Sequence, residues 1–300
     1  MSASELNMSV VIPTYNRSGS LSLCLDSLEK QVVPPYEVIV VIDGKPTDEV
    51  HQVIGNFRNK LSIIQITNHR GGEHLSRDIG AETATGDIVA YIDDDVILVP
   101  EWSAEILRGY QENKGVAGVG GRIINMTSFP KPWVWRAYVR VIQTLFRRKM
   151  GRISFIGLPY ARLYLPCDRL IEVDFLQGGN MSLRREILAS HKWEGLTYFS
   201  DESDLGIQLT RKEKRKLIYN SRAIAYHYPA LTGGSTRGRE RMHLAAKDYT
   251  ILILKNFNLK YLRLILFSIG VLVASLLTLR LQCMKAIWEG VKEYRVRYRG

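Results

Sequence analysis

The sequence predicts an α/β fold built on a mostly parallel sheet with helices on both faces. Short apolar runs recur through the N-terminal third of the chain, and segments with helical spacing of apolar residues separate them. Strands that are apolar throughout, rather than at alternate positions, are typical of sheets covered on both sides. With 300 residues, 46% of them hydrophobic, the chain is long enough to bury a substantial core.

The elements follow in a regular order. A β-branched strand is expected at residues 9–12, ended by Pro13, and a helix near 20–30, where Leu21, Leu25 and Leu28 share one face. Further strands are expected at residues 37–42, 61–66 and 87–92, and a second helix near 73–83. In such sheets ligands bind beyond the carboxyl ends of the strands. The residues directly after each strand are therefore the candidate functional residues.

Charge and cysteine content narrow the class of protein. The net charge of +11 predicts an anionic partner, such as phosphate groups or a membrane surface. The three cysteines, Cys24, Cys167 and Cys283, form no CxxC pair, which indicates free thiols rather than a disulfide framework or a zinc site. The polar N-terminus has no apolar h-region, so we expect no signal peptide. No nucleic-acid-binding signature is found, and no nucleic-acid partner is expected.

Turn-forming and aromatic residues follow the first two strands. Residues 13–17 read PTYNR, and Asp43 and Gly44 follow the second strand. Pro13 could simply form a turn, whereas Tyr15 could stack on a nucleobase. Asp43 could accept a hydrogen bond from a base N–H or a ribose hydroxyl.

Three adjacent carboxylates, Asp93, Asp94 and Asp95, follow the apolar run DIVAYI. Neighbouring negative charges at the end of a buried strand repel one another, so stability alone does not favour them. A divalent cation that bridges to a diphosphate removes that cost. Mg²⁺ or Mn²⁺, which prefer oxygen ligands, are the natural choices.

The second half of the chain adds further candidates. Asp201 and Glu202 open a helical pattern, where they could cap the helix or act as a general base toward an acceptor hydroxyl. Upstream, the turn at residues 177–180 (QGGN) allows close backbone approach to a ligand. His227 follows a strand-like run and is either structural or a third metal ligand.

Taken together, SVVIPTYNR, VIDG, RDIGAETATGDIVAYIDDD, FLQGGNMSLRREIL and DESDLGIQL resemble the family-two inverting glycosyltransferases, which have the GT-A fold. The resemblance covers roughly residues 8–230. It implies a nucleotide-diphosphate sugar donor, a divalent metal and a Rossmann-like sheet. The residues that it places are Pro13, Tyr15 and Asp43 around base and ribose; Arg77 and Asp94 near the nucleotide sugar; Asp93 and Asp95 as the metal-binding DxD pair; and Gly178, Gly179 and Asn180 on the acceptor side.

The sequence departs from that family at three points. The family commonly reads DDGS after the second strand, but here only Asp43 carries over. Asp78 stands where the family usually has Asn. In the family, the base is the second acid of a Glu-Asp-x-Asp-Leu pattern. That position is Glu202 here, and Asp201 is the alternative.

The resemblance implies a single displacement. The acceptor hydroxyl attacks the anomeric carbon while a carboxylate takes its proton, and the metal neutralises the leaving diphosphate. The alternative readings are a nucleotidyltransferase and a membrane-tethered scaffold that binds sugar nucleotides in a polysaccharide assembly complex. A nucleotidyltransferase is expected to carry a glycine-rich, basic loop after the first strand, and a scaffold is expected to have lost its base.

Two later segments could contact a membrane. Residues 131–152 hold seven Lys and Arg with interleaved aromatic residues and no acid, so they could form a solvated basic helix over a hydrophobic cleft, an interfacial helix on anionic lipid or a clamp on a phosphate-bearing acceptor. Residues 264–279 are uncharged, mostly apolar and just short of a bilayer span, so a short span, a re-entrant segment, an interfacial helix or a buried core or oligomer helix is expected. We therefore expect a catalytic domain at residues 1–230 and a helical, membrane-associated region at 231–300, on the cytoplasmic face of an anionic membrane with a lipid-linked or glycan acceptor.

Overall fold

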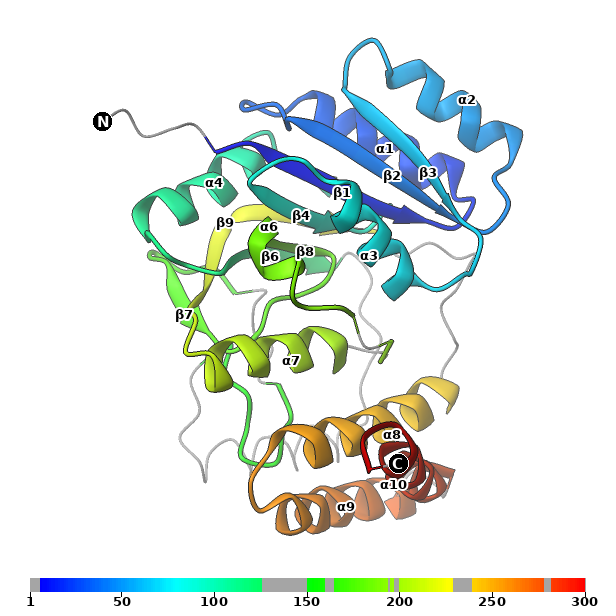
Figure 1. Ribbon diagram of the computed structural model, residues 1–300, viewed down its shortest axis with the longest axis vertical. Helices are drawn as coiled ribbons and strands as arrows, with labels where there is room; N and C mark the ends of the chain where they lie inside the picture. Colours follow the sequence, from blue (N-terminus) through cyan, green and yellow to red (C-terminus); the bar gives the residue numbers. More distant parts are fainter. Residues whose placement is uncertain are drawn as a thin grey trace.

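The computed structural model describes residues 6–125, 150–159, 165–193, 195–196, 200–228, 239–277 and 282–299. The strands are β1 (Met8–Thr14), β2 (Glu37–Asp43), β3 (Ile63–Asn68), β4 (Ile88–Ile92), β5 (Val96–Leu98), β6 (Gly118–Asn125), β7 (Ile171–Val173), β8 (Asn180–Arg184) and β9 (Leu217–His227). Within these residues they form one sheet in the order β3-β2-β1-β4-β8-β6-β9-β5, and β7 pairs with β9 (Figure 1).

The first half of the sheet is parallel, as the sequence predicts. β1 pairs with β2 and β4, and β2 pairs with β3, all in parallel. Alternate residues of each strand enter different cores: Val10 and Ile12 pack with Leu21 and Leu25 on one face, whereas Val11 joins a second cluster on the other. Burial on both faces explains why these strands are continuously apolar.

The second half of the sheet is mixed, which corrects the prediction of a mostly parallel sheet. β8 runs antiparallel to β4 and β6, and β5 and β7 run antiparallel to β9. The prediction extended the strand–helix repeat of β1–β4 to the whole chain. Only residues 93–95 separate β4 from β5, however, and a parallel connection needs a crossover of a dozen residues or more.

The helices cover both faces. They are α1 (Ser18–Glu29), α2 (Asp48–Phe57), α3 (Glu73–Thr83), α4 (Trp102–Glu112), α6 (Arg185–Leu188), α7 (Ser200–Ile207), α8 (Arg239–Asn256), α9 (Lys260–Leu277) and α10 (Gln282–Arg299). Apolar residues of α1, α2 and α4 share one core cluster with β1, while residues of α7 and α8 share the other. A π-helical turn, Gln208–Lys212, extends α7.

The three C-terminal helices lie together at the end of the molecule away from β2 and β3 (Figure 1). They are joined to the sheet-containing part by apolar contacts, because Leu252 and Phe257 belong to the same cluster as Trp193 and Leu205. Among the described residues, no helix has the length and apolar character needed to cross a bilayer. Most of the basic segment expected at residues 131–152 lies outside the described residues.

A buried charged clamp joins α7 to α8. Asp204 accepts hydrogen bonds from Lys255 (2.8 Å), Asn256 (2.5 Å) and Gln208 (2.6 Å), and its side chain is 2% exposed. A buried carboxylate needs such partners because it has lost its hydration. Since Asp204 lies two residues after Glu202, the clamp also fixes the helix that carries this candidate base.

We expect Lys255→Met to lower the free energy of unfolding by about 2–4 kcal/mol, because it leaves Asp204 buried without its cation. Urea unfolding followed by circular dichroism measures this change. Lys285→Met is the matched control: the Lys285–Glu289 pair is 3.8 Å long and Lys285 is 75% exposed, so a loss of no more than about 0.5 kcal/mol is expected. Equal losses in the two variants would contradict the role of the clamp.

Candidate active site

The candidate residues meet at the carboxyl edge of the parallel strands, and the register of β4 explains why. β1 pairs with β4 so that Val11 lies opposite Tyr91, and the same offset brings Thr14 beside Asp94. β8 pairs with β4 so that Ile92 lies opposite Asn180, which brings Gly179 beside Asp93.

Asp94 is the internal member of the acidic run. The Oγ1 of Thr14 donates to Asp94 at 2.6 Å, and Arg17 contacts both of its oxygens, through Nε (3.0 Å) and Nη2 (2.6 Å). Burial raises the pKa of Asp94 to about 6, against the lowering effect of Arg17. The sequence placed Asp94 against the nucleotide sugar, but its side chain is buried and held by protein groups. In this structure Asp94 holds the guanidinium of Arg17.

Asp93, Asp95 and His227 form the cluster that could hold a metal ion. One ligand atom from each lies within 4.8 Å of the others. β5 pairs antiparallel with β9 so that Val96 lies opposite His227, which brings the imidazole Nε2 to 3.0 Å from Asp95 Oδ1. Asp95 Oδ2 also accepts from Arg17 at 3.1 Å.

These three side chains are of the kinds that bind a divalent cation. Burial, followed by the charges of Glu73 and Asp95, raises the pKa of Asp93 to about 7. Burial acts to lower the pKa of His227, but the hydrogen bond and charge of Asp95 outweigh it and raise that pKa. In both groups neighbouring carboxylates contribute to the shift, so negative charge is concentrated at this point. The two carboxylates supply the oxygen ligands that Mg²⁺ and Mn²⁺ prefer, and imidazole is a common metal ligand.

Arg77 is the ionic partner of Glu202, and its charge also acts to lower the pKa of Asp93. From α3 its guanidinium donates to Glu202 Oε1 (3.2 Å) and Glu73 Oε1 (2.5 Å) and stacks 5.1 Å from the Trp193 ring centroid. The Trp193 ring in turn packs edge-on against Tyr91. A guanidinium held by an aromatic ring and two carboxylates keeps a fixed orientation. The resemblance placed Arg77 at the nucleotide; here it is the ionic partner of the candidate base.

Two adjacent glycines allow the backbone to approach these groups closely. A Cβ on Gly178 would collide with the Glu202 carboxylate and the Arg77 guanidinium, and a Cβ on Gly179 would collide with the Asp93 carboxylate. The pair therefore brings backbone against both the candidate base and the candidate metal ligand. Asn180, also predicted on the acceptor side, is different: its buried amide accepts from Trp102 Nε1 (2.7 Å) and donates to the carbonyls of Ala223 (2.9 Å) and Arg122 (3.2 Å). It ties the sheet to α4 and does not face the site.

The two neighbouring acids of α7 have different surroundings. Asp201 Oδ1 accepts the backbone N–H of Leu196 at 2.9 Å, and burial, then the Glu202 charge, raises the pKa of Asp201 to about 8. Glu202 instead faces Arg77 and Gly178. Asp201 thus holds a loop, whereas Glu202 lies among the site residues.

At the position where the sequence predicts the nucleotide, Tyr15 is 54% exposed beyond β1, and its ring lies beside Gly44. Both oxygens of Asp43 accept from the Gly72 N–H, at 3.0 and 3.1 Å. Gly72 has φ +107°, a conformation that an L side chain rarely adopts. Tyr15, Asp43 and this glycine turn therefore form one partly exposed shelf, with Pro13 at the end of β1 beneath it.

Sequence reasoning missed three residues of the site. Arg17 was predicted only as part of a turn. It follows one strand of the sheet while three acids follow another, and this was a usable signal for an ion pair. Glu73 and Trp193, which hold Arg77, carried no signal because their contacts depend on how α3 packs.

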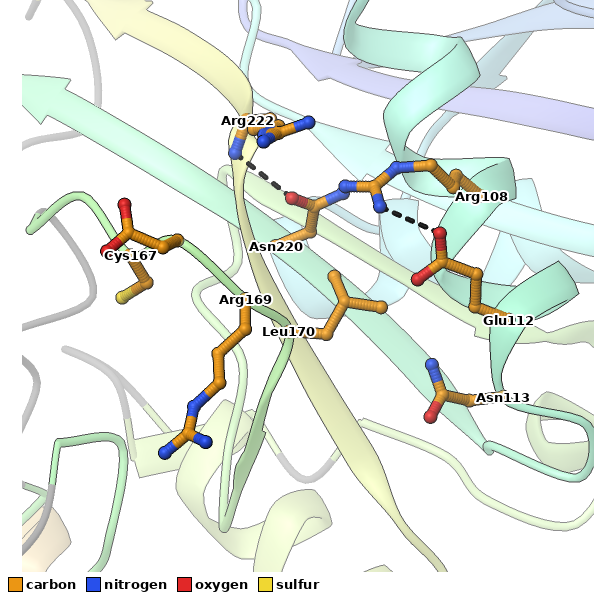
Figure 2. A pocket seen from close by; sticks show the side chains of 9 residues that line it. Arg108, Glu112, Asn113, Cys167, Arg169, Leu170, Asn220 and Arg222 are labelled. Carbon is orange, nitrogen blue, oxygen red and sulfur yellow. Dashed lines mark hydrogen bonds and ion pairs between the residues drawn. The ribbon is translucent and has the colours of Figure 1, made fainter.

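A separate pocket lies between α4, residues 167–170 and β9 (Figure 2). Its lining residues are Arg108, Glu112, Asn113, Cys167, Asp168, Arg169, Leu170, Asn220 and Arg222. None of the candidate site residues lines it.

The mixed sheet carries its acidic cluster directly after β4, at the carboxyl edge of the parallel strands. Residues 9–191 match the family model described as glycosyl transferase family 2. The chain belongs to this family.

Curated relatives match over part of their length. A glucosyl-dolichyl phosphate glucuronosyltransferase of Haloferax volcanii is 32% identical over 139 residues, which are 43% of this chain and 44% of that protein. The poly(ribitol-phosphate) β-N-acetylglucosaminyltransferase TarS of Staphylococcus aureus is 29% identical over 162 residues, 50% of this chain and 28% of TarS. The chain thus spans less than half of the length of either relative.

Solved structures share the fold. TarS residues 1–349 with UDP-GlcNAc superpose with a TM-score of 0.59 at 17% identity, covering 89% of this chain and 72% of that one. The mannosyltransferase PcManGT of Pyrobaculum calidifontis, in complex with GDP-Man and Mn²⁺, gives 0.58 at 14% identity over 98% and 76%. These similarities confirm the mixed, helix-flanked α/β architecture of GT-A glycosyltransferases.

We expect Gly179→Ala to lower kcat/KM by about 100-fold or more, because its Cβ displaces the Asp93 carboxylate and a displacement of about 1 Å at a catalytic group has such an effect. Nucleotide release from a sugar nucleotide measures it. Gly19→Ala is the control, since a Cβ there meets nothing within 4 Å. Unchanged turnover in a folded Gly179→Ala protein would show that Asp93 is not part of the site.

Proposed function

We propose that this chain transfers a sugar, with inversion, from a nucleotide-diphosphate sugar to a hydroxyl of a lipid-linked or growing glycan acceptor. One observation carries the proposal. Glu202 lies against Gly178, and Asp93, a member of the Asp93–Asp95–His227 cluster, lies against the adjacent Gly179. A carboxylate base beside a cation-binding cluster is what a direct displacement of a diphosphate leaving group requires.

Glu202 is the proposed base. Its carboxylate takes the proton of the acceptor hydroxyl as that oxygen attacks the anomeric carbon. Arg77 holds the carboxylate in place through the 3.2 Å ion pair and shares its charge with Glu73. One displacement inverts the anomeric centre, so no covalent intermediate and no nucleophilic Ser or Cys is needed.

The donor is proposed to lie on the Tyr15 shelf. The exposed Tyr15 ring offers a stacking surface for a base, and Asp43 retains acceptor capacity for a ribose hydroxyl or base N–H. That the solved relatives hold UDP-GlcNAc and GDP-Man supports a nucleotide-diphosphate sugar as donor.

A divalent cation is proposed at Asp93, Asp95 and His227. When bound, the ion supplies positive charge for the diphosphate leaving group. The residues present fit Mn²⁺ or Mg²⁺, and the Mn²⁺ complex of PcManGT supports this choice.

The proposed acceptor class agrees with the names of the relatives. The Haloferax enzyme is named for a dolichyl phosphate glycolipid and TarS for a poly(ribitol-phosphate) polymer. Both are large phosphate-bearing molecules, and a chain with net charge +11 is suited to attract such acceptors. We propose that the enzyme meets its acceptor on the cytoplasmic face of a membrane.

The base assignment is tested by two isosteric variants. With a panel of sugar nucleotides, we expect Glu202→Gln to lower kcat by about 10²–10⁴-fold with donor affinity retained, because a general base contributes about that much. Asp201→Asn can still accept from the Leu196 N–H, and we expect it to lose less than about tenfold. If Asp201→Asn abolishes turnover while Glu202→Gln does not, Asp201 is the base.

The metal site is tested by direct binding. We expect Asp95→Asn to weaken Mn²⁺ binding by about tenfold or more, measured as free Mn²⁺ by electron paramagnetic resonance, because the substitution removes an anionic ligand. Asp26→Asn is the control, since Asp26 of α1 is half exposed and pairs with Lys30, which follows the helix. Mn²⁺ affinity that is equal in wild type and Asp95→Asn would exclude Asp95 as a ligand.

A further inference from the structure

The outer face of α9 is apolar and exposed along its whole described length. The side chains of this face are Tyr261, Leu262, Ile265, Ile269, Leu272, Val273 and Leu276, which are 39–59% exposed. They recur at spacings of three and four residues and so share one side of the helix. The opposite side carries Phe267 and Val271, which pack in a core cluster with Ile287 of α10. The helix is therefore apolar on both sides, and within the part of the chain that the structure describes only one side is buried by protein.

The two charged residues of α9 contact aromatic side chains elsewhere in the protein. Arg263 lies 4.1 Å from the Phe155 ring centroid and 4.7 Å from that of Phe257. Lys260 donates to the Tyr294 hydroxyl at 3.2 Å. Because aromatic contacts hold both cations, charge is drawn toward the protein side of the helix.

The neighbouring helix α10 presents a basic face with a tryptophan at its centre. Lys285, Trp288, Lys292 and Arg295 are exposed and lie at helical spacing. Lys292 lies 5.2 Å from the Trp288 ring centroid. Trp and Lys side chains of this kind are typical of the boundary between lipid headgroups and acyl chains.

Charge decides which partner fits these two faces. Residues 239–300 carry twelve Lys and Arg but only four Asp and Glu, so most of the chain's net charge of +11 lies here. A second copy of the chain would bring two strongly basic regions together, which is unfavourable. An apolar strip beside a basic face is instead complementary to a membrane with anionic headgroups.

We propose that α9 lies flat in the surface of an anionic bilayer, with its outer face in the headgroup–acyl boundary, and that α10 adds electrostatic attraction. α9 is then an interfacial anchor and not a span. The inference rests on the proposed function only for its purpose, which is to hold the enzyme beside a membrane-borne acceptor. Through α8 and the Asp204 clamp, the anchored helices are joined to the helix that carries Glu202.

The test uses full-length protein and co-flotation with vesicles of phosphatidylcholine, with and without phosphatidylglycerol. We expect wild type to bind the anionic vesicles more tightly. The triple variant Ile265→Ser/Ile269→Ser/Leu276→Ser should bind about 100-fold more weakly, because each half-exposed aliphatic side chain contributes about fivefold on burial in lipid. The matched control is Leu23→Ser/Val32→Ser/Val33→Ser, which removes exposed apolar side chains far from α9 and should bind as wild type.

The electrostatic part has its own variant. Lys285→Gln/Lys292→Gln/Arg295→Gln should lose about fivefold in affinity per charge at low salt, and the loss should shrink as salt rises. The proposal is overturned if wild type does not bind anionic vesicles, or if the α9 variant binds them as tightly as wild type. An α9 variant that converts a dimer to a monomer in size-exclusion chromatography without affecting vesicle binding would also overturn it, because the face would then be a protein interface.

Donor binding is measured on the same samples. Both surface variants should retain sugar-nucleotide binding and wild-type thermal unfolding, which excludes misfolding as the cause of lost vesicle binding. If wild type binds vesicles but no sugar nucleotide, the proposed function fails and the membrane surface stands. If wild type binds sugar nucleotides but no vesicles, the proposed membrane surface fails and the proposed function stands.

Discussion

The constraint on which the site depends is the balance of charge at the carboxyl edge of β4. Asp93, Asp94 and Asp95 follow a buried strand, and burial raises the pKa of the first two to about 7 and about 6. Arg17 contacts both oxygens of Asp94 and reaches Asp95 with one nitrogen. Asp93 and Asp95 are the two carboxylates that lie with His227. The arrangement thus gathers two carboxylates and an imidazole at the place where a divalent cation is proposed.

A second guanidinium balances the other half of the site. Arg77 lies between Glu73 and Glu202 and is stacked on Trp193, so the carboxylate proposed as base has a fixed partner. The backbone completes this arrangement, since any side chain at Gly178 or Gly179 would displace Glu202 or Asp93. The Asp204 clamp to α8 then extends the same network into the C-terminal helices. These helices are therefore part of the architecture that positions Glu202, and not a detached appendage.

The sequence predicted the parallel half of the fold well because its signal is local. The first four strands and α3 lie within about two residues of their expected bounds, since apolar runs and turn residues mark both ends. The mixed half was not foreseen, because strand direction depends on pairing between β4, β8 and β6. Among the candidate site residues, those in short motifs after strands came together. The sequence could not show that Asn180 and Asp94 are buried and held by other protein groups, because a buried amide or carboxylate looks the same in a sequence as an exposed one. Arg17, Glu73 and Trp193 were missed because each acts through a partner distant in the chain.

The central claim is that Glu202, held by Arg77 beside the acidic cluster, drives a single displacement at the anomeric carbon. The most direct measurement is the anomeric configuration of the first-formed product, read by proton NMR during turnover with an accepted sugar nucleotide of known configuration. The account predicts that the product has the opposite anomeric configuration to the donor. A product that retains the donor's configuration would contradict it, because retention requires a second displacement or a front-side mechanism that this arrangement of one base and one leaving-group site does not provide.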